Sequence, residues 1–517
     1  MTPLTRASLG SWQQFLLALA SGLLLALGFA PWNLWPCTIL GVAVMTWLAA
    51  GRRGRRGFGL GMLAGVTYFG ATIWWVGAQA GPVVWALVVV MALWIGLVGM
   101  ATSYLAKLRC WMLLVPCAWG AVEFGTGQIP FGGFPWQRLG FTTIDQPLAG
   151  WLPFLGTPGA TWFVAFAGCC VLAVAAGPRR WLPALSAAGV FATGGLLLLI
   201  PVAQPQETVN VGMVQGNVEL GELGGYIAAT GATPHHLSET VFLLAEARAT
   251  GRPLDLIVWA ENSTDTDPTL NRTTHAQVTA AVELAQVPIF VGALTSGPEP
   301  DTRQTTSQVW VPGTGITAQY HKRNLAPFGE FVPLRDILEP LFPAVKRAGD
   351  QSIPGTGPGV VTIPVAGHPD LQVGTVICYE LAYDQTVYDT VVEGAQILVA
   401  QSTTHNFSGS SEPWQQMTIN RVRAAELRRD FVATTLNGYS GLIDAKGQVH
   451  EPTREYTAAH RIYTVPLRDN VTLAVHAAPV LSITHLVVVI AAIVVAVRMP
   501  SKIDRNHKAV IIPKEPQ

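Results

Sequence analysis

One cysteine, Cys378, lies in the polar part of the chain where a predicted strand ends and a predicted helix begins. The strand is the apolar run at residues 373–377, and Tyr379 and Glu380 directly follow the cysteine. The amino end of a helix favours the thiolate, which is the nucleophilic form of cysteine. We therefore expect Cys378 to be exposed at this turn and activated for nucleophilic attack.

Cys378 has no cysteine partner in its own part of the chain. The other five cysteines lie in or beside long apolar segments, at Cys37, Cys110, Cys117, Cys169 and Cys170. An unpaired thiol in an oxidising compartment is a liability unless it is buried and inert or kept for its reactivity. The isolation of Cys378 alone leaves both alternatives open.

Two further charged residues follow predicted strands. Glu261 comes after the apolar run at residues 256–260, and Lys322 comes after residues 319–321. Each is by itself explained equally well as a solvated side chain. Together with Cys378, however, they would supply a proton acceptor, a fixed positive charge for an oxyanion and a nucleophile, which acyl transfer requires. We call Glu261, Lys322 and Cys378 the trio.

Short apolar runs alternate with helical patterns around the trio. Runs typical of buried strands lie at residues 209–214, 254–259, 287–294, 309–311, 373–377, 397–400 and 431–435. Helical patterns lie at residues 236–249, 275–285, 386–394 and 414–429. The alternation predicts an α/β domain with helices layered over sheets. Residues 219–234, 340–358 and 403–413 look irregular, which is typical of lids, binding elements or plain surface loops.

The rest of the chain is too apolar to be wholly soluble. The 517 residues are 50% hydrophobic and 12% charged, with a mean hydropathy of +0.36. Residues 12–50 and 57–106 contain no Asp, Glu, Lys or Arg, and each can hold two spans of about 20 residues. Further spans near residues 111–126, 159–177, 182–203 and 480–497 bring the predicted total to about eight.

Charged residues set the orientation of these spans, because Lys and Arg in short loops stay on the cytoplasmic side. If the chain crosses the membrane eight times, the basic residues of the short loops and ends all lie on that side: Arg6, Arg52, Arg53, Arg55, Arg56, Lys107, Arg109, Arg179, Arg180, Arg498 and Lys502. We expect seven spans in residues 1–206, an extracytoplasmic catalytic domain at 207–478, a last span at 479–498 and a cytoplasmic tail at 499–517. The first span lacks a clear signal-peptidase site.

Some classes of site and partner are disfavoured. Residues 207–478 hold 28 acidic and 17 basic side chains, which argues against nucleic acid as a partner. The histidines lack ligand spacing, and no glycine-rich phosphate loop joins a strand to a helix, so we expect no metal and no cofactor. Glu123 is the only acidic residue inside a predicted span, where it is either functional or within reach of water.

The motifs of the trio resemble a known family. Trp259-Ala260-Glu261-Asn262, the segment 320–330 around Lys322 and Gly374-Thr375-Val376-Ile377-Cys378-Tyr379-Glu380 follow the Glu-Lys-Cys order of the nitrilase superfamily. Segments 322–333, 413–415 and 421–427, and the membrane motifs at 27–32 and 133–136, are similar to its membrane branch, the apolipoprotein N-acyltransferases. The resemblance implies a bundle of about eight membrane helices that carries an αββα sandwich domain.

The resemblance also implies what the trio does. Cys378 would be the nucleophile, Glu261 the general base and acid, and Lys322 the stabiliser of the tetrahedral oxyanion. Glu330 matches a second glutamate that orients the lysine or assists proton transfer. For the matched neighbours of the cysteine, Tyr379 and Glu380, local structural support is an equal alternative.

The implied activity is the transfer of a fatty acyl chain in the bacterial cytoplasmic membrane. The donor would be a phospholipid and the acceptor the N-terminal amine of a diacylglyceryl-cysteine apolipoprotein, with a cysteine thioester between them. From the composition, we also expect the membrane bundle and loop residues 340–358, with Leu341 and Phe342, to admit the lipid laterally and exclude water. Two alternatives are a membrane-anchored nitrilase-like amidase, which needs only one anchor, and a lipoprotein-binding scaffold, which needs no trio.

The chain departs from the family pattern in two places. After Ser402 it has Thr403, Thr404, His405 and Asn406, and before Asn437 it has Leu436. These differences leave the details of the lid and the substrate pocket open.

Overall fold

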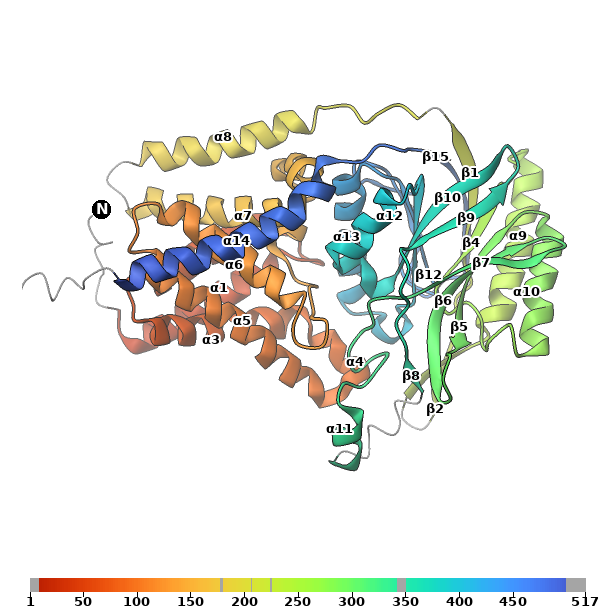
Figure 1. The fold of residues 1–517 in the computed structure, drawn as a ribbon, viewed down its shortest axis with the longest axis horizontal. Helices are drawn as coiled ribbons and strands as arrows, with labels where there is room; N and C mark the ends of the chain where they lie inside the picture. Colours follow the sequence, from red (N-terminus) through yellow and green to blue (C-terminus); the bar gives the residue numbers. More distant parts are fainter. Residues whose placement is uncertain (1–8, 177–179, 206, 224–225, 342–349, 499–517) are drawn as a thin grey trace, which may run out of the picture.

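The computed structural model describes residues 9–176, 180–205, 207–223, 226–341 and 350–498. In these ranges a helical bundle lies beside a layered α/β domain (Figure 1). The long helices of the bundle are α1 (Ser11–Leu27), α2 (Trp35–Ala49), α3 (Gly54–Thr72), α5 (Val84–Leu105), α6 (Trp111–Thr126), α7 (Leu152–Ala176), α8 (Trp181–Leu197) and α14 (Leu473–Arg498). Each segment predicted to span a membrane therefore overlaps a helix, and the predicted tail at 499–517 lies outside the described residues.

Some of these helices have the length and composition of membrane spans. Among the described residues, Gly81–Leu105, Pro147–Ala176 and Leu473–Arg498 are long and apolar enough to cross a bilayer. Three apolar helices are shorter: Ser11–Leu27, Trp35–Ala49 and Trp181–Leu197. On α14, the side chains of Val480, Ile483 and Val487 are more than half exposed, as a lipid-facing surface requires. The total of eight spans stays a prediction.

Helices α3 and α5 pack closely because glycines line their contact. A Cβ atom on Gly61 would lie 2.4 Å from the carbonyl oxygen of Ile95, and one on Gly99 would lie 2.3 Å from that of Gly57. Small residues let helix backbones approach one another where no hydrophobic effect drives helices together. The contact fixes the position of α5, whose first turns line the cavity described below.

The α/β domain contains two sheets that pack face to face. The first has the strand order β15-β1-β4-β5-β6-β7, with β8 beside β6, and the second has the order β14-β13-β12-β11-β10-β9. Val258 and Phe290 of the first sheet share a core with Val373 and Val399 of the second. The strands are β1 (Thr208–Gln215), β4 (Leu256–Trp259), β5 (Ile289–Ser296), β6 (Thr302–Val311), β7 (Gly315–His321), β8 (Gln351–Ser352), β9 (Val360–Val365), β10 (His368–Ile377), β11 (Ile397–Ser402), β12 (Phe431–Thr435), β13 (Gly441–Ile443), β14 (Val449–His450) and β15 (Ala459–Pro466).

Helices cover the outer face of each sheet, which makes four layers (Figure 1). Helices α9 (Ala232–Thr250) and α10 (Arg272–Ala285) cover the first sheet through a core that includes Leu243 and Val278. Helices α12 (Asp384–Val392) and α13 (Glu412–Leu427) lie between the second sheet and the bundle, so α13 is buried on most sides. Every predicted strand and helix of this domain overlaps an observed one, which confirms the α/β class.

The segments predicted to be irregular are only partly so. The prediction is wrong for residues 219–234, which contain the paired strands β2 (Glu219–Leu223) and β3 (Tyr226–Thr230) and the start of α9. Strand β2 contains two glutamates and a glycine, so it is not a continuous apolar run of the kind that predicted the other strands. Helix α11 (Arg335–Leu341) and β8 extend into residues 340–358, while Phe342 and the side chain of Leu341 lie outside the described residues.

A chain of buried charges joins the bundle to the α/β domain. Glu123 of α6 is buried, where it accepts hydrogen bonds from the backbone N–H of Leu139 (2.7 Å) and from the Thr161 hydroxyl. Its Oε2 lies 3.5 Å from Nε of Arg138. A terminal nitrogen of the same guanidinium lies 2.6 Å from Oδ1 of Asp384 in α12. Glu123 therefore binds partners inside the protein and does not reach water.

Glycines on the two faces of α3 offer a matched test of the helix contact. We expect Gly61→Ala to destabilise the protein by about 1–3 kcal/mol, because the new methyl group meets the backbone of α5. Gly59→Ala meets no atom within 4 Å and gains helix propensity of up to about 1 kcal/mol. Thermal unfolding in detergent measures both, and equal melting temperatures for the two variants would contradict the packing described.

Candidate active site

The trio comes together where three strands end. Glu261 follows β4, Lys322 directly follows β7 and Cys378 directly follows β10. All three line one cavity of about 460 Å³, and Glu330 lines it too. The structure thus brings the three residues singled out in the sequence together in one cavity.

The ammonium of Lys322 lies between two carboxylates. Its Nζ is 3.2 Å from Oε1 of Glu261 and 2.9 Å from Oε1 of Glu330, and the lysine is 2% exposed. Burial by itself would lower the pKa of Lys322, but the negative charges of Glu261 and Glu330 outweigh it and hold that pKa well above its usual range. Lys322 therefore keeps its positive charge at the site.

Both carboxylates are held by backbone donors. The second oxygen of Glu261 accepts the N–H of Thr403 at 2.7 Å, and that of Glu330 accepts the N–H of Ala326 at 2.7 Å. Burial raises the pKa of Glu261, Lys322 opposes the rise and the neighbouring charge of Glu330 adds to it. A carboxylate with a raised pKa both accepts and returns a proton readily, which suits a general base and acid.

Cys378 lies in a left-handed turn with φ of +52°, a conformation that costs a non-glycine residue energy. Glu380 holds this turn. Its Oε2 accepts the N–H of Ile377 at 2.9 Å, while its Oε1 accepts the Tyr320 hydroxyl at 2.8 Å and the N–H of Arg323 at 2.6 Å. Glu380 thus joins the cysteine turn to the end of β7, beside Lys322.

The surroundings of Cys378 favour the neutral form of its thiol, because they raise its pKa. Burial raises its pKa well above the usual range and the charge of Glu261 raises it further, while Lys322 pulls the other way. The expectation of a thiolate favoured by a helix is wrong, because only the short η6 (Cys378–Ala382) follows and one helical turn has a small dipole. The thiol must therefore lose its proton to a base as it attacks.

Tyr379 ties the cysteine turn to the bundle. Its hydroxyl donates to the carbonyl of Gly133 at 3.0 Å, and its ring stacks with Phe134 and Trp136 at centroid distances of 5.8 and 6.0 Å. Both supporting neighbours of Cys378, Tyr379 and Glu380, thus act on its position through contacts the sequence did not reveal.

Apart from Phe134 in the motif at 133–136, the sequence patterns did not mark the apolar wall of the cavity. This wall comes from the bundle and from the loop before α7, and includes Trp75, Val84, Leu87, Met91 and Phe134. Helix α5 is apolar along its whole length, so no periodicity marks which of its side chains face the cavity. Glu412, at the first position of α13, also lines the cavity and was not singled out.

Gln415 of α13 anchors the α/β domain on the bundle. Its Oε1 accepts the indole N–H groups of Trp75 and Trp136 at 3.1 and 2.9 Å and the amide of Gln137 at 2.9 Å. Its Nε2 donates to the carbonyl of Thr72 at 3.0 Å. One buried side chain thus holds both tryptophans beside the cavity.

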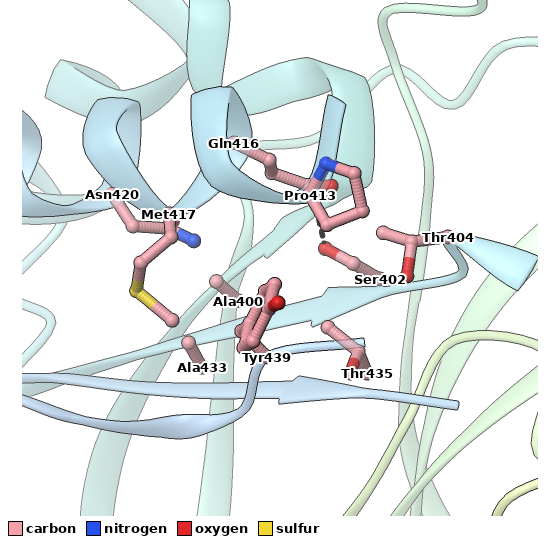
Figure 2. Close-up of a pocket in the computed structure, with 10 residues that line it drawn as sticks. All are labelled: Ala400, Ser402, Thr404, Pro413, Gln416, Met417, Asn420, Ala433, Thr435 and Tyr439. Atoms are coloured by element: carbon pink, nitrogen blue, oxygen red, sulfur yellow. Dashed lines mark hydrogen bonds between the residues drawn. The ribbon is translucent and has the colours of Figure 1, made fainter. Parts of the chain in front are cut away.

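Figure 2 shows a second, far smaller pocket where α13 packs over β11 and β12. Its volume of about 10 Å³ is close to that of one water. Thr404 Oγ1, Gln416 Oε1 and Asn420 Oδ1 lack a hydrogen-bond partner in the described part of the chain, and Gln416 Nε2 donates to the Ser402 hydroxyl. The pocket is a packing feature of α13, separate from the trio.

Comparison with known proteins agrees with this geometry. Residues 21–170 match the apolipoprotein N-acyltransferase N-terminal domain, and residues 213–468 match the carbon-nitrogen hydrolase family. The apolipoprotein N-acyltransferase of Mycolicibacterium smegmatis is 29% identical over 93% of this chain and 84% of its own length. The chain belongs to the apolipoprotein N-acyltransferase family.

A second relative carries the same name, and the solved structure of a differently named protein matches part of the chain. The apolipoprotein N-acyltransferase of Vibrio cholerae is 27% identical over 83% of this chain and 86% of its own length. A solved amidase of the nitrilase superfamily from Nesterenkonia covers 54% of this chain and 95% of its own length, with 14% identity and a TM-score of 0.37. Family membership confirms the resemblance drawn from the motifs and makes the chain a membrane acyltransferase.

The charges around Lys322 predict how the rate of acyl-enzyme formation depends on pH. Glu261 must be ionised to accept a proton, so activity falls as the pH drops through its raised pKa. Glu330→Gln removes a charge that raises the pKa of Glu261, and we therefore expect the acid limb of the rate of acyl-enzyme formation to move to lower pH. Glu339→Gln, on the partly exposed Arg335 pair of α11, is the control and should leave the limb in place.

The rate of acyl-enzyme formation, measured across the acid range for the wild type and both variants, tests this prediction. An acid limb that stays in place in Glu330→Gln, or moves to higher pH, would contradict the assignment of Glu261 as the base.

Proposed function

We propose that this chain moves a fatty acyl chain from a membrane phospholipid to the N-terminal amine of a diacylglyceryl-cysteine lipoprotein, through a thioester on Cys378. The observation that carries the proposal is the single cavity in which the trio faces an apolar wall of bundle helices. A soluble amide substrate would need no such wall. Family membership supports the same activity.

In the first half-reaction, Glu261 takes the thiol proton as the Cys378 sulfur attacks the ester carbonyl of the phospholipid. Lys322 stabilises the oxyanion of the tetrahedral intermediate, because its charge is already fixed in a buried site and needs no rearrangement. When the carbon–oxygen bond breaks, Glu261 returns the proton to the departing lysophospholipid. The enzyme then carries the acyl group as a thioester.

In the second half-reaction, the acceptor amine attacks the thioester carbonyl. Glu261 takes a proton from the nitrogen as the amide bond forms, the carbon–sulfur bond breaks and the proton passes to the sulfur of Cys378. Lys322 again faces the oxyanion. The trio returns to its starting state, so one carboxylate serves both halves.

The cavity offers a route for the acyl chain. Val83 and Ile129 line it and are 51% and 59% exposed, so its apolar end reaches the surface of the bundle. On the proposed route the donor lipid enters there sideways from the bilayer. The expectation that residues 340–358, with Leu341 and Phe342, admit the lipid falls partly on residues 342–349, which lie outside the described part of the chain.

We place the chain in the bacterial cytoplasmic membrane as a multi-pass protein, with the α/β domain on the extracytoplasmic side. Helix α14 runs away from the sheets to end at Arg498, and α8 runs toward them from Arg180 (Figure 1). Both arginines thus lie at the end of the bundle far from the catalytic domain. Positive charge at that end supports the proposed orientation.

Transfer of a labelled acyl chain from phospholipid to a synthetic diacylglyceryl lipopeptide tests the proposal. We expect transfer by the wild type, none by Cys378→Ala, and a rate lower by about 10²–10³-fold in Lys322→Met, because the oxyanion loses its fixed charge. Lys446→Met removes an exposed lysine on a turn and is the control, with an unchanged rate.

The alternative functions give different products. An amidase that hydrolyses a soluble amide would leave the labelled phospholipid intact and put no label on the lipopeptide. A scaffold without catalysis would let Cys378→Ala replace the wild type in cells that lack the native enzyme. Either result would overturn the proposed transfer.

A further inference from the structure

Glu412 is a buried carboxyl group that the trio and Glu330 do not use. It is 2% exposed and lines the same cavity as Cys378 and Glu261. Within the described part of the chain, no donor reaches its Oε2. A buried carboxyl oxygen without a partner is costly, so an unpaired one inside a substrate cavity points to a ligand that completes it.

The first turn of α13 holds Glu412 in this place. Gln415 and Gln416, three and four residues further on, are bonded to the bundle and to β11, and the Gln416–Ser402 bond is drawn in Figure 2. These bonds hold the first turn of α13, and with it the backbone of Glu412, against both surfaces.

The ionisable groups that act on Glu412 leave its charge unbalanced. They are the carboxylates of Glu261 and Glu455 and the thiol of Cys378, while Lys322 is already shared by Glu261 and Glu330. Burial first, and then the two carboxylates, raise the pKa of Glu412 well above its usual range. Glu412 is thus a neutral acid in the resting cavity, in a place that favours a cation.

We propose that Glu412 binds the ammonium form of the acceptor's α-amino group and takes up its surplus proton. The inference rests on the proposed transfer to an amine. An α-amino group has a pKa of about 7.7–8.0, so most of it is ammonium at neutral pH, and an ammonium has no lone pair with which to attack. Two protons must therefore leave the nitrogen, and Glu261 accounts for only one.

The protons balance over the second half-reaction. As the ammonium docks, Glu412 releases its acid proton to the medium, helped by the positive amino end of α13. The resulting carboxylate takes one proton from the ammonium, and the free amine forms the carbon–nitrogen bond while the carbon–sulfur bond breaks. Glu261 moves the second proton to the sulfur of Cys378. Glu412 ends as a neutral acid, and one proton has been released in total.

Separate measurement of the two halves tests this role. Purified enzyme is first loaded with acyl chain from phospholipid without acceptor, and then chased with lipopeptide on either side of the α-amino pKa. We expect Glu412→Gln to form the acyl-enzyme and to discharge it at neutral pH about a hundredfold more slowly, the lower end of the range for a lost proton acceptor. Its discharge rate should climb steeply with pH, since it depends on amine that is already neutral.

Three controls separate this role from a structural one. Hydroxylamine is uncharged at neutral pH and should discharge the wild type and Glu412→Gln alike. Glu412→Asp keeps the acid and should restore the shallower pH profile of the wild type. Glu393→Gln removes an exposed carboxyl group that does not line the cavity, and should behave as the wild type.

Several results would overturn the inference. One is an equal discharge rate and pH profile in Glu412→Gln and wild type, and another is slow discharge by hydroxylamine as well as by lipopeptide, which indicates a distorted site. If Glu412→Gln does not load, a Glu412→Asp variant that loads but keeps the steep pH profile overturns it as well. If the wild type never forms the acyl-enzyme from phospholipid, the proposed function itself is refuted. The loading step therefore tests the proposed function separately from the role of Glu412.

Discussion

One buried ammonium shared by two carboxylates governs the chemistry of this site. Lys322 lies within 3.2 Å of Glu261 and 2.9 Å of Glu330, so a single positive charge faces two negative ones. The excess negative charge and the burial keep the Cys378 thiol neutral and raise the pKa of Glu261. The site therefore depends on proton transfer during attack, and the ammonium remains available for an oxyanion.

That arrangement holds only if two parts of the chain keep a fixed relation. The N–H of Thr403 fixes Glu261, and the helix that soon follows, α13, is bonded to the bundle through Gln415. Tyr379 next to the nucleophile likewise reaches the backbone of Gly133. The bundle thus forms one wall of the cavity and also positions the groups on the other. This coupling explains why helix α13 is buried on most sides.

The sequence predicted the parts of the fold that leave a local pattern. Buried strands such as 373–377 and helices such as 414–429 have clear apolar runs, and the motifs around Glu261, Lys322 and Cys378 mark the strand ends. It could not predict that Glu380 braces the cysteine turn, because that contact joins residues about 57–60 positions apart. Nor could it single out Glu412, since an acidic residue at the start of a helix is usually a simple helix-stabilising feature.

A thioester on Cys378 is the species on which the proposed transfer depends. Intact mass spectrometry of the purified protein, incubated with a phospholipid of one defined acyl chain and no acceptor, detects it directly. We expect a mass increase equal to that acyl group, located on the peptide that contains Cys378, removed by hydroxylamine and absent from Cys378→Ala. Efficient transfer to lipopeptide without any such adduct, or with an adduct that persists in Cys378→Ala, would contradict it.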